Sequence, residues 1–165
     1  PEAGHLLHMP THLDVLAGDY AAVVRDNARA IAADARAMQV SPRTSNPESF
    51  YFGYAVHNFH MLVYGCILGA MEGKATETAA ALNAHVHEGL FRRRPDLAAY
   101  LESYAALDVH VLVRFGRWEE ILRLALPADR TLMLYRSATL YFARALAFAN
   151  TGRTDAAEGE ARAHA

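Results

Sequence analysis

The chain has 165 residues, of which 53% are hydrophobic and 21% charged, and its formal net charge at pH 7 is −2. These values are typical of one folded domain with a buried core and exclude a disordered chain. They give no basic surface for nucleic acid, because the one basic cluster, residues 92–94, is typical of a solvated helix end. The single cysteine, Cys66, excludes a disulfide framework and thiolate metal clusters, and is typical of a reducing compartment.

No apolar stretch reaches the ~18 residues that a membrane-spanning helix needs, because charged residues or histidines interrupt each one. We therefore expect no membrane partner. The chain begins Pro-Glu-Ala-Gly, so we expect it to be a piece of a longer protein. Targeting signals could lie outside such a piece, and the cytoplasm is the default expectation for localisation.

Apolar residues at helical spacing predict helices along almost the whole chain. Residues 13–38 are rich in alanine and read as two helices broken at Gly18. Residues 39–49 contain two prolines and several polar turn formers, which predicts a loop. The remaining predicted helices cover residues 50–71, 76–86, 95–115 and 118–126, and a last pair lies on either side of Gly152. Few runs alternate with a period of two, so the fold class is predicted to be all-α.

The predicted breaks share one pattern, in which a glycine and a polar residue precede the next helix. The four glycines are Gly18, Gly73, Gly116 and Gly152. Glycine suits these places because a helix commonly ends on a residue in the left-handed conformation, which glycine adopts without strain. The spacing between successive glycines shrinks along the chain toward the ~34-residue period of tetratricopeptide arrays. We therefore expect repeated helix–turn–helix hairpins.

The segments FANTGRTDAAEGEARA and VRFGRWEEILRLALP resemble the tetratricopeptide repeat, with Trp118 just inside a second helix and the small residues Ala157 and Ala161 where helices approach closely. The opening GHLLHMPTHLDVLAG is similar to a subgroup of bacterial tetratricopeptide proteins with a His-Met-Pro-Ser-His segment, Thr11 standing in place of serine. The stretch YAVHNFHMLVYG resembles the His-Asn-Leu-His segment of the same subgroup, with Phe59 in place of leucine.

This resemblance implies a right-handed stack of about four helix–turn–helix hairpins, a tetratricopeptide-like α-solenoid. Residues 1–165 would form a single helical-repeat domain, part of a longer array. In such arrays the first helices line a concave groove that holds a peptide or protein segment. The exposed end helices of a shortened array could also pair in a homodimer.

The histidines keep a common register to the turn glycines. His12 and His110 lie six residues before their glycines, and His5 and His60 lie thirteen before. His8 lies ten before and His57 sixteen before. Steps of three, four and seven residues fall on one helix face, so the six imidazoles are predicted to point into the groove. Pro10 could kink the first helix and turn His5 and His8 away from His12.

Neutral imidazole is a good ligand for Zn, Cu, Ni or Fe, and a helix offers two nitrogens to one ion at spacings of three or four. The register therefore predicts a transition-metal site. The predicted ligands are His8, His12, His57 and His60, with His5 and His110 as outer members. Asp14 and Asp108 are candidate acceptors for the ring N–H groups of these ligands.

Three functions remain open from these residues. The first is a helical-repeat binding module whose histidine-lined concave face holds a metal. The second is a metal-dependent enzyme that uses the same histidines with an open position for water or a small ligand. The third is a metal-free scaffold that binds a peptide or protein in the groove. Metal content separates the third function from the first two.

Overall fold

The structure is a computed structural model that describes residues 3–41, 46–47 and 49–164. Every regular element among these residues is helical, which confirms the all-α class. The chain forms two compact units, Pro1–Leu82 and Asn83–Ala165. Each unit is described by itself. The single-domain organisation and the stack of about four hairpins therefore stay predictions.

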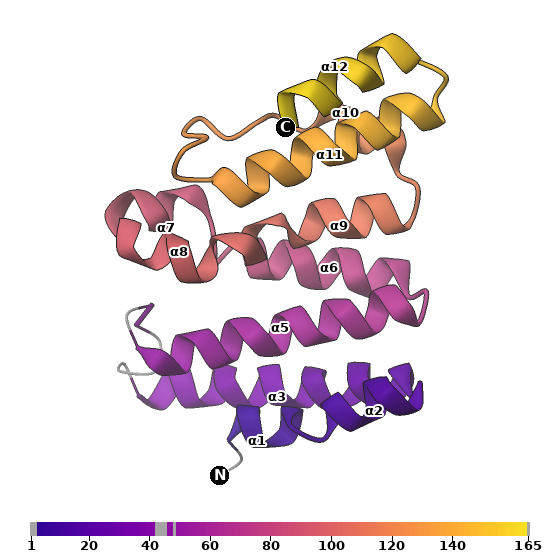
Figure 1. Cartoon of the computed structure of the whole chain (residues 1–165). Helices are drawn as coiled ribbons and strands as arrows, with labels where there is room; N and C mark the ends of the chain where they lie inside the picture. Colours follow the sequence, from indigo (N-terminus) through magenta and orange to yellow (C-terminus); the bar gives the residue numbers. More distant parts are fainter. Residues whose placement is uncertain (1–2, 42–45, 48, 165) are drawn as a thin grey trace. The chain divides into compact units, whose positions relative to one another are not determined.

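The first unit is built around the long helices α3 and α5. Its elements are α1 (Gly4–His8), α2 (Thr11–Ala17), α3 (Tyr20–Val40), α5 (Phe50–Leu68) and α6 (Glu72–Asn83). Helix α3 packs against α5, and the short helices α1 and α2 follow one another along α3 (Figure 1). Helix α1 also contacts α5. The start of the chain is thus held by two helices at once.

Helix α3 presents a mixed face to the interior of this unit. It begins at a strong N-cap, because the side chain of Asp19 accepts a hydrogen bond from the backbone N–H of Ala22. Its buried stripe follows helical spacing and contains Val23, Asn27, Ala30 and Asp34. Two polar side chains, an amide and a carboxylate, therefore lie on the buried face of α3.

Helix α5 is buried on most of its circumference and approaches α3 closely. A Cβ atom at Gly65 would lie 2.6 Å from Cγ1 of Val23, so the two helices touch where residue 65 has no side chain. Cys66, the next residue, is fully buried. Burial raises the pKa of its thiol to about 11. The thiol therefore keeps its proton, as is typical of an unreactive core cysteine.

Three of the four predicted turn glycines are confirmed. Gly18, Gly116 and Gly152 have φ values of 76°, 66° and 77°. The prediction for Gly73 is wrong, because Gly73 lies inside α6 and the left-handed residue after α5 is Ala70, with φ of 56°. The backbone N–H of the residue after each of the four left-handed positions bonds to the carbonyl five residues before it. This bond closes the turn, and an alanine can form it at some cost in backbone strain.

The second unit contains shorter helices around α11. Its elements are α7 (Glu88–Arg93), η1 (Pro95–Leu97), α8 (Ala98–Leu101), η2 (Glu102–Ala106), α9 (Leu107–Arg114), α10 (Trp118–Arg123), α11 (Leu134–Asn150) and α12 (Thr154–His164). The core comprises Val109, Ile121, Leu140, Ala143 and Ala147. The continuous helix predicted over 95–115 is wrong, because 3-10 segments interrupt it. The helix predicted over 118–126 ends early, because the backbone becomes extended at Leu124, three residues before Pro127.

The predicted loop at 39–49 is only partly described. Helix α3 continues through Val40, so the first two residues of the predicted loop are helical. Residues 42–45 and 48 of this prediction lie outside the described part of the chain. Asn46, Pro47 and Ser49 are not in a helix, and the side chain of Ser49 caps α5 by accepting a hydrogen bond from Phe52 N–H.

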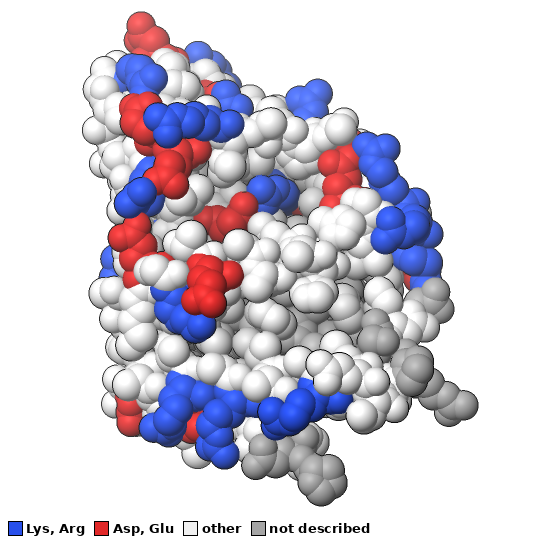
Figure 2. Space-filling model, turned by 180° about the vertical axis from the view of Figure 1, so that it is seen from behind, with Lys and Arg blue, Asp and Glu red and all other residues white. Residues whose placement is uncertain are grey.

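Charged side chains of opposite sign pair on the surface. Arg92 lies in the last turn of α7, as expected for a helix end, and pairs with Glu88. Arg25 pairs with Asp26 on α3, with Nη2 and Oδ2 2.7 Å apart. Figure 2 shows several places where blue and red side chains lie next to one another. Of the helices that the structure describes, none is both long and apolar enough to cross a membrane.

Candidate metal centre

The break at Pro10 leaves His8 and His12 facing each other. His8 ends α1, and His12 lies in the first turn of α2. The backbone at Met9 and Pro10 stays near helical values, with φ and ψ of −52° and −41° at Met9 and −61° and −26° at Pro10. The four-residue spacing therefore still places both rings on one side. Their Nε2 atoms lie 3.0 Å apart, so the predicted turning away of His8 does not occur.

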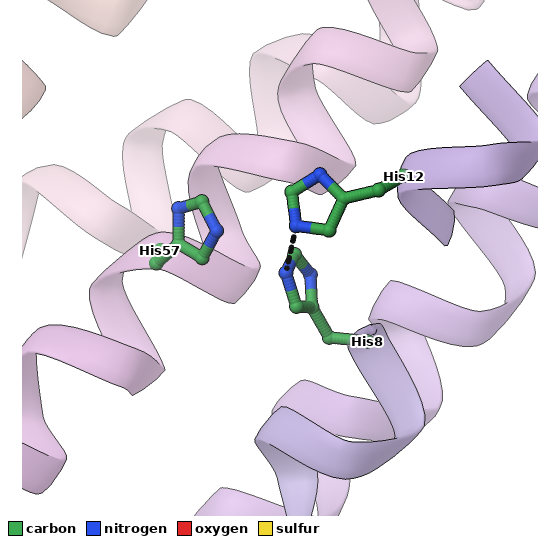
Figure 3. A group of neighbouring side chains, drawn as sticks. All are labelled: His8, His12 and His57. Atoms are coloured by element: carbon green, nitrogen blue, oxygen red, sulfur yellow. Dashed lines mark hydrogen bonds between the residues drawn. The ribbon is translucent and has the colours of Figure 1, made fainter. Parts of the chain in front are cut away.

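His57 of α5 completes a group of three imidazoles with His8 and His12 (Figure 3). One ring nitrogen from each residue lies within 4.8 Å of the other two. Nitrogens bound at ~2.1 Å to one tetrahedral ion lie roughly 3.4 Å apart, so small rotations of these side chains would bring all three to one ion. Three neutral nitrogen donors can hold a transition metal and leave a fourth position for another ligand.

Asn27 determines which nitrogen of His8 faces this group. The amide nitrogen of Asn27 donates to Thr11 Oγ1 (3.1 Å) and to the carbonyl of Val23 (2.8 Å). Its oxygen is thereby left to accept the proton of His8 Nδ1, at 2.8 Å. Thr11 in turn donates to the carbonyl of His8 (2.7 Å). His8 is therefore held as the Nδ1–H tautomer, with the lone pair of Nε2 directed to the other histidines.

Burial keeps the inner histidines neutral. His8 is 0% exposed, His57 is half-buried and His12 is exposed. Burial, with a smaller contribution from the neighbouring imidazoles, lowers the pKa of His57 to about 4. Burial also lowers the pKa of His8, against an opposing effect of its hydrogen bond to Asn27. Metal binding requires the neutral ring, so these two residues are in the ligating state at pH 7.

The other predicted ligands lie outside the group of three. His5 stacks on Tyr54 with ring centroids 3.9 Å apart, and its ring is 5.2 Å from that of His8. The ring centroids of His60 and His57 are 6.1 Å apart. His110 belongs to α9 of the second unit, and its relation to the other histidines stays a prediction.

The corrected turn position changes the register of the second histidine pair. Counted from Ala70, His60 lies ten residues before the turn, as His8 does before Gly18. His57 then lies thirteen before, as His5 does. The two helix segments therefore carry histidines at equivalent positions. His5 thus corresponds in position to His57, and His8 corresponds to His60. Counting from Gly73 had instead given His5 and His60 the same position.

The polar residue that supports His8 was not among those predicted. Asp108 forms an ion pair with Arg136 in the second unit. Arg136 Nη1 lies 2.6 Å from Asp108 Oδ1, and Arg136 Nη2 lies 3.0 Å from Asp108 Oδ2. Among the described residues, Asp14 forms no hydrogen bond to any of the three grouped rings. Asn27 instead accepts the ring proton of His8, which is the role predicted for Asp14. The sequence did contain a signal for such partners, because two polar residues, Asn27 and Asp34, occupy positions on the buried stripe of α3. Polar residues at such positions are usually read as exposed.

Asp34 holds the other end of α3 to its neighbours. Its Oδ1 accepts the hydroxyl proton of Tyr51 (2.7 Å), and its Oδ2 accepts an amide proton of Asn58 (2.7 Å). Burial and the nearby Asp34 raise the pKa of Tyr51 to about 12, so the phenol keeps its proton. A Cβ atom on Gly4 would overlap the Asp34 carboxylate, which explains the glycine at the start of α1.

Comparison with known proteins adds no further assignment, since no protein-family model, no curated protein and no solved structure matches this chain. Arguments about function therefore depend on the geometry of the histidines.

Proposed function

We propose that the first unit is a metal-binding module in which His8, His12 and His57 hold one transition-metal ion. The observation that carries this proposal is the convergence of three ring nitrogens within 4.8 Å from three helices. The Asn27 hydrogen bond adds to it, because a ligating histidine commonly donates its second N–H to a fixed acceptor. The all-nitrogen donor set favours Zn²⁺, Cu, Ni or Fe over Mg²⁺ or Ca²⁺, which prefer oxygen.

The wider setting that we propose is a helical-repeat protein with the histidines on its concave face. The shared hydrogen-bonded turn after α2, α5, α9 and α11 supports this proposal, because repeat proteins reuse one turn at each hairpin. His60 and His5 would then be the neighbours through which a peptide or a small ligand meets the metal. His110 would lie further along the same groove.

Elemental analysis of chain purified without chelator tests the metal proposal. We expect about one equivalent of transition metal in the wild type and loss of that metal in a His12→Ala/His57→Ala variant. The matched control is His85→Ala/His87→Ala, because both of these histidines are exposed and lie in the turn before α7. The control should keep the metal.

Two results would contradict the proposal. One is retention of the full metal content by the His12→Ala/His57→Ala variant. The other is a metal-free wild type whose melting temperature does not rise when Zn²⁺, Cu²⁺, Ni²⁺ or Fe²⁺ is added. In that case the histidines would be recognition residues of a metal-free peptide-binding scaffold.

A second candidate function is metal-dependent catalysis at the same site. Two observations favour it: the group contains three protein donors, and His12 is exposed. Catalytic zinc sites commonly have three protein ligands and a fourth position open to water or substrate. Spectroscopy of the Co²⁺-loaded protein separates the two functions. A spectrum that changes on adding azide indicates an exchangeable position, and an unchanged spectrum indicates a closed binding site.

A further inference from the structure

Asp34 is a buried carboxylate that has no cationic partner among the residues that the structure describes. It is 2% exposed, and both of its hydrogen bonds come from neutral donors, Tyr51 and Asn58. Within the described part of the chain, no lysine, arginine or histidine forms an ion pair with it. Burying an unpaired negative charge costs much free energy unless a positive charge lies close by.

Two contacts of Asp34 lead toward the site proposed above. Asn58, which donates to Asp34, directly follows the candidate ligand His57. Gly4, which touches the carboxylate, lies one helical turn before the candidate ligand His8. Asp34 thus contacts the residue that follows His57 and the first residue of the helix that ends in His8.

We propose that Asp34 is the buried counter-charge of the metal ion held by His8, His12 and His57, and that it makes the site prefer doubly charged over singly charged ions. This inference depends on the proposed metal-binding function. Three neutral imidazoles leave the full charge of the ion uncompensated, and Asp34 supplies the missing negative charge inside the unit. Its attraction for the ion is proportional to the charge of the ion. A divalent ion therefore gains twice as much from Asp34 as a monovalent one.

The test compares the dissociation constants of Zn²⁺ and Ag⁺, measured by competition titration on the full chain. Asp34→Asn keeps the shape of the side chain and removes its charge. The amide of Asn58 can turn to accommodate it, because Asn58 Oδ1 is buried without a hydrogen-bond partner and can accept from the new amide. We expect this substitution to weaken Zn²⁺ binding by about 10- to 100-fold, and Ag⁺ binding by only about the square root of that factor.

Two matched variants isolate the buried charge. Asp26→Asn removes a negative charge from the same helix at a surface position paired with Arg25, and Tyr51→Phe removes a hydrogen bond to Asp34 while leaving its charge. Both should keep the wild-type ratio of the two constants. A structural role for Asp34 would lower both affinities by the same factor. The inference is overturned if Asp34→Asn weakens Zn²⁺ and Ag⁺ binding by the same factor. It is also overturned if Asp26→Asn changes the ratio of the two dissociation constants as much as Asp34→Asn does.

Failure of the metal proposal is visible separately, because a wild-type chain that binds neither ion contradicts both proposals before any variant is compared. If Asp34→Asn does not fold, as judged by circular dichroism, Asn58→Ala takes its place. That variant keeps the charge and removes one of its two neutral donors. The inference then predicts a preference for Zn²⁺ at least as large as in the wild type, and a smaller preference overturns it.

Discussion

At the scale of single residues, the centre depends on neutral imidazoles held by buried polar partners. His8 illustrates this best, because its burial and its hydrogen bond to Asn27 fix both its protonation state and its orientation. The sequence predicted that these histidines are metal ligands and that their rings lie on one side of the helices. It did not predict Asn27 or Asp34, because an amide and a carboxylate in a helix are ordinarily expected to face water. Their burial follows only from the way α1, α2 and α5 cover α3.

The low pKa of His57 predicts that the metal-free protein loses stability in mild acid. The unfolded chain takes up a proton on this residue near the ordinary pKa of 6.5, whereas the folded protein does so only near 4. Between these values the unfolded state binds more protons, so the free energy of unfolding falls as the pH falls. Above about pH 6.5 this residue contributes no pH dependence. Urea unfolding at several pH values in the presence of chelator measures the effect.

A His57→Gln variant should lose part of this pH dependence, since the titrating group is removed. His85→Gln is the control, because His85 is exposed in a turn, and this variant should keep the wild-type pH dependence. An identical fall in stability for wild type and His57→Gln between about pH 6.5 and 4 would show that His57 is not the group responsible.

At the scale of elements, α3 is the support of the proposed centre. Its buried stripe reaches α1 and α2 through Asn27 and α5 through Asp34, while its apolar positions pack on α5. The extent of this helix was predicted to within a few residues from its alanine-rich pattern. The end of α5 was predicted less well, because Gly73 matched the expected turn and Ala70 did not. An alanine in the left-handed conformation has no signal in a sequence.

The close approach of α3 and α5 predicts opposite outcomes for two glycine substitutions. Gly65→Ala places a Cβ atom 2.6 Å from the buried side chain of Val23, and we expect it to lower the free energy of unfolding by about 1–3 kcal/mol. Gly73→Ala meets no atom within 4 Å and lies inside α6. We expect it to raise the free energy of unfolding by up to about 1 kcal/mol, because alanine favours the helix.

Urea unfolding of both variants measures the difference. Both substitutions make the same chemical change within a helix, so the gain in helix propensity is shared and the difference reports the packing of α3 on α5. Equal effects of the two substitutions would mean that Gly65 is not needed for the contact with Val23.

At the scale of the whole molecule, composition and periodicity were sufficient for the all-α class and for three of the four turns. They were insufficient for the short helices of the second unit, where 3-10 segments interrupt the long helix expected after Pro95. Short 3-10 segments have no hydrophobic period of their own, so the pattern of apolar residues does not distinguish them from a continuous helix. The histidine group was within reach of sequence reasoning because helical spacing determines which rings share a side.

X-ray absorption at the zinc edge of the Zn²⁺-loaded chain tests the central claim most directly, because it reports the atoms that surround the ion. We predict one bound Zn²⁺ with three imidazole nitrogens at ~2.0–2.1 Å, and the loss of one imidazole from this shell in His57→Ala. A shell of oxygen atoms without imidazole, or an unchanged shell in His57→Ala, would contradict the assignment of His8, His12 and His57 as the metal ligands.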